Sequence, residues 1–169
     1  AIYLARTDQA GNLLEERRLA DGRENGLGLG PKLAVQQTAD GGLLLAGSSA
    51  YVYADIHLLK IDASGQIVWE KAYGGQRADH LGALVAIPAG GYVIAGSTFT
   101  SGTSRWDVLL VKIDAAGEIV WEKRYGGEAD QRAGAIWRTS DGGYIVAGST
   151  DAPRADRAKT VDVYLLKID

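Results

Sequence analysis

The chain has no cysteine, only two histidines and only three prolines among its 169 residues. Without cysteine, a disulfide framework, a thiolate zinc site and a thiol nucleophile are all excluded. No apolar run approaches the roughly 20 residues that a membrane-spanning helix needs. The 18 Lys and Arg against 21 Asp and Glu leave a formal net charge of -3, which gives no basic surface for nucleic acid. We therefore predict a folded domain with no nucleic-acid partner and no membrane span.

What the chain does have is an internal repeat, which is the first feature to look for in any sequence. The segment KIDASGQIVWEKAYGG at 60–75 returns as KIDAAGEIVWEKRYGG at 112–127, and LLKID closes the chain at 165–169. A diverged copy, YLARTDQAGNLLEERRL, covers 3–19. The periods are 54, 52 and 55 residues when they are counted between the aspartates that end each KID-type segment, Asp8, Asp62, Asp114 and Asp169.

Each repeat divides into four short apolar runs separated by turn residues, which is typical of β-strands. In one complete set of four these runs cover 82–87, 92–98, 107–114 and 118–125. Paired glycines precede the second run of each repeat and permit the positive φ angles of a tight hairpin. Counted from Ile2, the chain begins with the third and fourth strands of a repeat and ends with the third. This order predicts thirteen strands.

The distribution of apolar residues predicts how these strands are covered. The second and third strands are apolar on both faces, as at 92–95 and 108–111, so other layers must cover both sides of their sheet. The fourth strand alternates charged and apolar residues, as an edge strand does. No segment has a helical period, so the covering layers must be other sheets. We predict an all-β fold, a β-propeller of four-stranded antiparallel blades, with repeats at 1–54, 55–106 and 107–161 and a surplus strand at 162–169.

The repeat resembles a known family. The string YGGEADQRAGAIWRTSDGGYIVAGST followed by DVYLLKID resembles the repeats of secreted bacterial and archaeal β-propeller proteins, and the likeness covers the whole chain. It implies an extracellular or cell-envelope location. The chain is more loosely similar to pyrroloquinoline-quinone-type propellers, whose blades also place a Trp after a turn. Trp69 and Trp121 occupy that place, and Glu15 replaces Trp in the first copy. We interpret both tryptophans as shielded wedges between blades, and we predict no cofactor.

Propellers usually close with about four to eight blades, so three repeats leave a ring incomplete. We expect additional blades, either from a longer protein of which the chain is a segment or from a second copy. Strand addition at an open sheet edge is a third possibility.

The loops that follow the second strand of each repeat differ in length and content, which favours that end of the blades as a binding surface. Aromatic and arginine side chains anchor protein and glycan partners. The candidate binding residues are therefore Tyr51, Tyr53, His80, Phe99, Arg105, Trp106, Arg154 and Arg157. Alternatively, Trp106 packs between blades, and the loops vary in sequence without forming a binding surface.

Two further carboxylates, Asp79 and Asp130, recur in the loop before the first strand of a repeat. They could bind calcium or act as a glycosidase acid/base pair, or they could cap the loop by accepting backbone N–H bonds. We expect the serines that recur at one strand end, Ser48, Ser49, Ser97 and Ser149, to bond backbone groups of neighbouring blades.

These observations predict a non-enzymatic extracellular or envelope scaffold that binds protein or glycan through its variable loops. The alternative is part of a propeller enzyme, glycan-active or quinoprotein-like, whose active site is completed by other blades.

Overall fold

The computed structural model describes residues 2–19, 32–48, 54–151 and 161–169, and these contain thirteen strands and no helix. The N-terminal hairpin consists of β1 (Ile2–Thr7) and β2 (Leu13–Leu19). The first sheet contains β3 (Leu33–Gln37), β4 (Leu43–Ser48), β5 (Ile56–Ile61) and β6 (Ile67–Tyr73). The second sheet contains β7 (Asp79–Ala86), β8 (Tyr92–Thr100), β9 (Arg105–Ile113) and β10 (Ile119–Tyr125). The third sheet contains β11 (Gln131–Arg138), β12 (Tyr144–Thr150) and β13 (Asp162–Ile168).

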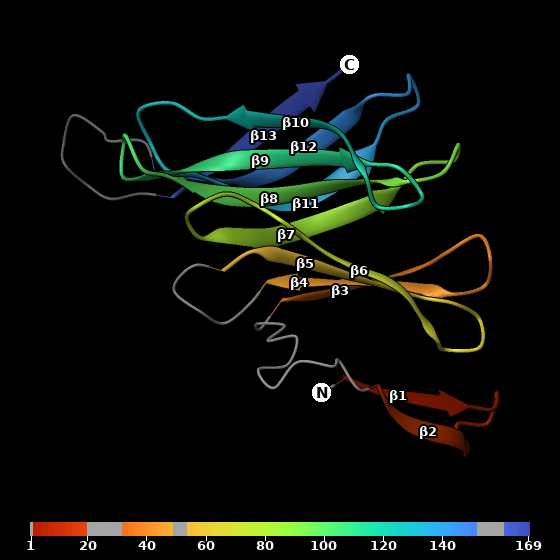
Figure 1. The fold of residues 1–169 in the computed structure, drawn as a ribbon. Coiled ribbons are helices and arrows are strands. Elements are labelled where there is room, and N and C mark those ends of the chain that lie inside the picture. Colours follow the sequence, from red (N-terminus) through yellow and green to blue (C-terminus); the bar gives the residue numbers. More distant parts are fainter. Residues whose placement is uncertain (1, 20–31, 49–53, 152–160) are drawn as a thin grey trace.

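Every strand pair is antiparallel, and strands that follow one another in the sequence are neighbours within each sheet. Figure 1 shows the sheets stacked in sequence order, from the N-terminal hairpin at one end to the third sheet at the other. The described strands form an open stack and not a closed ring. The prediction of an all-β fold made of antiparallel sheets is therefore confirmed.

The aspartate that ends each KID-type segment closes the turn into the next strand. Asp8, Asp62 and Asp114 each accept a 2.9 Å hydrogen bond from the backbone N–H four residues later. The side chain thereby satisfies a donor that the turn leaves outside the strand ladder. This local bond explains why the same aspartate recurs in these turns.

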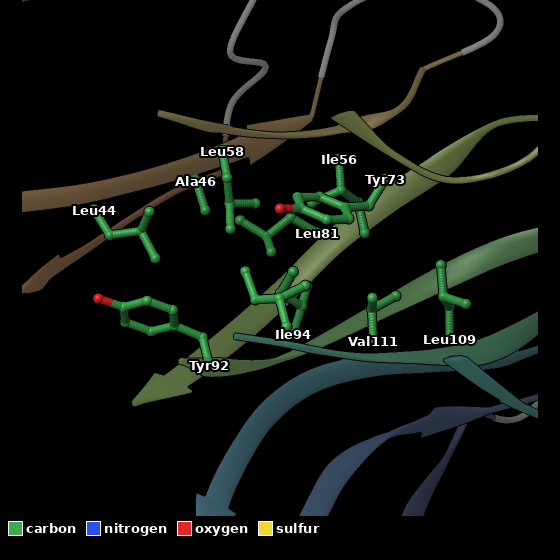
Figure 2. Close-up of a cluster of buried hydrophobic side chains, with 11 residues drawn as sticks. Leu44, Ala46, Ile56, Leu58, Tyr73, Leu81, Tyr92, Ile94, Leu109 and Val111 are labelled. Atoms are coloured by element: carbon green, nitrogen blue, oxygen red, sulfur yellow. The ribbon is translucent and has the colours of Figure 1, made fainter. Parts of the chain in front are cut away.

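Two apolar cores lie between the sheets. The core between the first and second sheets includes Leu44, Leu58, Leu81 and Ile94, and Figure 2 shows its side chains converging from both sheets. The core between the second and third sheets includes the residues Val93, Ala95, Val108, Leu110, Ile136 and Val146. Val93 and Ile94 are adjacent in β8, belong to different cores and are both fully buried. The predicted two-sided cover of the second sheet is confirmed.

Specific polar contacts also join neighbouring sheets. The hydroxyl of Ser48 accepts a 2.6 Å bond from the backbone N–H of Leu81, and Ser97 accepts one of 3.1 Å from Ala133. Both serines thus bond the first strand of the next sheet, as the sequence predicts. The hydroxyl of Tyr73 donates at 2.8 Å to the carbonyl of Gly117 in the β9–β10 turn.

Trp69 and Trp121 depart from the expectation of full shielding, because both side chains are half-buried. Trp69 packs against the first core, and its Cη2 would lie 3.2 Å from a β-carbon on Gly117 of the next sheet. Trp121 packs against the second core. Both rings therefore lie against a neighbouring sheet, but β6 and β10 are edge strands, which leaves part of each ring in water.

Candidate functional site

Four of the eight candidate binding residues fall in the described part of the chain. Phe99 lies near the end of β8, Arg105 and Trp106 open β9, and His80 lies in β7. The other four, Tyr51, Tyr53, Arg154 and Arg157, lie outside the described residues.

Three of the four described candidates form a cluster at one end of the second sheet. The rings of His80 and Trp106 are tilted by 31° with centroids 4.6 Å apart. Phe99 pairs with Trp106 across β8 and β9, edge to face, at 5.5 Å. No ring contact or hydrogen bond of the Arg105 side chain belongs to this cluster. The cluster is partly exposed, since Phe99 and Trp106 are half-buried and His80 is exposed.

A fourth member, Arg132, was not among the predicted residues. Its guanidinium carbon lies 4.4 Å from the centroid of the Trp106 ring, which is the geometry of a cation–π contact. Arg132 belongs to β11 in the third sheet, so Trp106 contacts side chains of two sheets. The strand registers place Arg132 opposite Ser149 just as His80 lies opposite Ser97. The signal available in the sequence was that this position of the first strand carries a polar ring in one repeat and a guanidinium in the next.

The environment of His80 disfavours its charged form. The ring packed against His80 removes part of its hydration, and this partial desolvation and the nearby Arg132 guanidinium lower the pKa of His80, while the neighbouring Asp79 carboxyl acts in the opposite direction. The imidazole is therefore neutral at physiological pH and can accept or donate a hydrogen bond.

A polar hollow of about 350 Å³ opens at the same end of the second sheet. The β6–β7 loop and the end of β8 supply its lining, which consists of Gly75, Gln76, Arg77, Thr98, Phe99, Thr100, Ser101 and Arg124. Arg124 also forms an ion pair with Glu122 at 3.1 Å, and Arg77 is exposed. The Thr100 hydroxyl donates to Asp107 at 2.5 Å and Thr98 is buried, so Arg77, Arg124 and the exposed Ser101 are the polar groups that a ligand can reach. Two guanidinium groups and a hydroxyl beside one aromatic ring suit a ligand that carries acidic groups.

We expected Asp79 and Asp130 to occupy equivalent positions, but they do not. Asp79 pairs with Thr98 across β7 and β8, whereas Gln131, not Asp130, pairs with the matching Thr150. Asp130 therefore lies one residue before the strand. Its carboxylate accepts a 2.9 Å bond from the backbone N–H of Trp106, and the carboxylate of Asp79 accepts one of 2.7 Å from Gly75. Both aspartates bind backbone groups, as the capping interpretation predicts.

Asp79 is nevertheless unusual, because its side chain is fully buried and its Oδ1 has no hydrogen-bond partner. Burial raises the pKa of Asp79, and the nearby negative charge of Asp55 adds to this, while bonds from Thr98 and Gly75 lower it. Groups of three or more His, Asp or Glu side chains able to hold a metal ion are absent from the described residues.

We expect the Asp79 carboxyl to make folding less favourable as the pH rises. Because its pKa is raised above 3.8 in the folded state, its stabilising contribution is complete below the unfolded value and is lost as the pH rises through the folded value. Between about pH 3 and pH 7 the variant Asp79→Asn should gain stability relative to the parent as the pH rises. Urea unfolding at several pH values, followed by tryptophan fluorescence, measures this difference.

Asp40 provides a control of opposite sign. Hydrogen bonds from Lys60, at 2.7 Å, and from Thr38 hold the pKa of Asp40 well below its ordinary value. Its contribution is therefore present above the unfolded value and is lost as the pH falls, so Asp40→Asn should lose stability relative to the parent as the pH rises. Equal slopes for the two variants would contradict the assignment of Asp79 as a buried acid.

No known protein-family model matches the chain, and no curated protein matches it. No helix in the described residues has the length and apolar character needed for crossing a bilayer. The function proposed for the candidate site is therefore argued from its side chains alone.

Proposed function

We propose that the chain is a β-propeller segment and a non-enzymatic interaction module of the cell exterior or envelope. Its stacked antiparallel sheets, two of them four-stranded, support the propeller, and the resemblance of the repeat to secreted propeller proteins supports the location. The described residues bring together no nucleophile with a general base. The hydroxyls of Ser48 and Ser97, at the recurring strand ends, accept backbone hydrogen bonds between sheets instead.

The observation that carries the proposed binding role is the polar hollow between the β6–β7 and β8–β9 connections. It lies at the end of the sheets where the loops of the three repeats diverge, next to the cluster of His80, Phe99 and Trp106. Arg77 supplies a bidentate guanidinium that matches carboxylate or sulfate groups, and Arg124, whose Nε and one terminal nitrogen bond Glu122, keeps further N–H donors beside it. The partner is therefore a protein or glycan that presents acidic groups.

The experiment is a binding assay against an array of neutral glycans, acidic glycans and acidic peptides. We expect binding to acidic members only, weakened at least about tenfold by the double variant Arg77→Ala and Arg124→Ala, since each lost charged bond is worth about 1.5–3 kcal/mol. Arg138→Ala is the matched control, because Arg138 is exposed at the opposite end of β11. Binding to no member, or an equal loss with Arg138→Ala, would contradict this role.

A further inference from the structure

The outer face of the third sheet repeats a surface that the second sheet buries. In the second sheet, Ala95 pairs with Leu110 and Ser97 with Val108; in the third sheet, Ala147 pairs with Leu165 and Ser149 with Val163. The registers are identical, so Leu165 and Val163 occupy the places of Leu110 and Val108. We call the surface formed by Ile145, Ala147, Ser149, Val163 and Leu165 the outer face.

Burial at these matching positions is opposite. Leu110 and Val108 are both 0% exposed beneath the third sheet, whereas Leu165 is 63% and Val163 is 78% exposed. Adjacent exposed valine and leucine side chains on one sheet form an apolar patch of the kind that marks an interface. The outer face also carries Ser149, at the position where Ser48 and Ser97 accept an N–H from the next sheet.

A complementary surface lies at the other end of the stack. Val35 in β3 is 62% exposed, although its counterpart Ile136, which pairs with Val146 as Val35 pairs with Leu45, is only 6% exposed. Leu33 beside it is equally exposed. We call the surface formed by Leu33, Val35, Leu43 and Leu45 the back face of the first sheet.

The N-terminal hairpin covers this back face incompletely. Among the hairpin side chains that the structure describes, Leu4 is the one that packs in the cluster with Leu43, Leu45, Leu59 and Ile61. A cavity of about 600 Å³ remains between hairpin and sheet, lined on the two sides by residues that include Leu4, Glu15, Leu43 and Ile61. An apolar contact with a cavity of this size is poorly packed compared with protein interiors. The N-terminal hairpin is therefore packed only weakly against the first sheet.

We propose that the outer face of the third sheet docks on the back face of the first sheet of a second copy of this chain. In the register that the chain uses between its own sheets, β13 of one copy takes the place of β1 of the other. It displaces β1 from β2, and β2 of that second copy then pairs with β13 as the fourth strand of the third sheet. The backbone N–H of Leu33 then donates to the hydroxyl of Ser149, as the N–H of Leu81 donates to Ser48 within one chain. Such a head-to-tail contact made twice by two copies closes a ring of six sheets, within the usual range of about four to eight. This association rests on the repeated faces and does not depend on the ligand at the polar hollow.

Sedimentation velocity of the full chain at micromolar concentrations tests the proposal. We expect a species of twice the 17.9 kDa chain mass. The variant Val163→Lys with Leu165→Lys, and separately Val35→Lys, should each weaken association at least about tenfold, because a lysine would be buried without a partner. Circular dichroism should match the parent, since all three side chains are largely exposed within one chain.

Val120→Lys is the matched control. Val120 is 57% exposed in β10, and its counterpart Val68 is 54% exposed in β6, so this position lies outside the contact between sheets in both repeats. It should leave the dimer intact. Mixing the two association-deficient variants should restore a dimer, since together they retain one intact outer face and one intact back face. A monomeric parent chain, an undiminished dimer in the face variants, or an equal loss with Val120→Lys would overturn the proposal.

Discussion

Replacing Gly91 by alanine is expected to destabilise the chain by more than about 3 kcal/mol. Gly91 has φ +85°, and a β-carbon there would lie 2.2 Å from the carbonyl oxygen of Ile113 in the adjacent strand. The substitution combines left-handed strain with a collision against backbone that cannot move without breaking the ladder. The same approach recurs at Gly42 and Gly143, at 2.1 and 2.2 Å from a carbonyl. Urea unfolding followed by tryptophan fluorescence measures the loss.

The neighbouring Gly90 is the control for strain alone. Its φ is +98°, but the nearest atom to an added β-carbon is Cβ of Ala115 at 3.8 Å. Gly90→Ala should therefore cost only about 1–2 kcal/mol, the penalty of the left-handed conformation. If Gly90→Ala proved as costly as Gly91→Ala, the close approach to Ile113 would not be the cause.

Leu110→Ala is expected to lower the free energy of unfolding by about 2–5 kcal/mol, the usual range for truncating a buried leucine. Leu110 is fully buried in the core between the second and third sheets, together with Val93 and Val146. Sheets packed face to face cannot collapse onto a cavity without shifting several strands together. Denaturant titration of the variant gives the value.

Val120→Ala, on the neighbouring strand β10, should cost about 1 kcal/mol or less, because Val120 is exposed and its loss reflects strand propensity alone. A similar loss for Leu110→Ala and Val120→Ala would mean that the third sheet does not pack on the second in solution.

The local elements could be predicted because their causes are local. Paired glycines fix the hairpins, and an aspartate such as Asp62 closes each turn by bonding a backbone N–H four residues away. Continuous apolar runs such as 92–95 predict a strand with another sheet packed on each face. The alternation of charged and apolar residues around Trp121 predicts a strand at the edge of its sheet. The recurrence of Ser48 and Ser97 at equivalent strand ends indicated bonds between sheets, and the structure places them there.

The candidate site was less accessible to such reasoning. Asp79 follows Gly74 by five residues and Asp130 follows Gly126 by four, and this offset of one residue matters because only Asp79 lies within a strand and has a buried oxygen without a partner. The cation–π contact of Arg132 with Trp106 joins residues of two sheets and depends on how far one sheet is offset from the next. No spacing within a single repeat encodes that offset.

The sequence by itself determined the repeat, the number and order of the strands, and which strands are edges, because periodicity and turn chemistry act over a few residues. Only the tertiary structure decided which apolar faces meet. Leu110 and Leu165 occupy matching positions of the repeat and the same strand register, yet one is fully buried and the other 63% exposed. A side chain is buried only where another sheet packs on its face. Matching residues of similar repeats therefore differ in burial according to the place of their sheet in the stack.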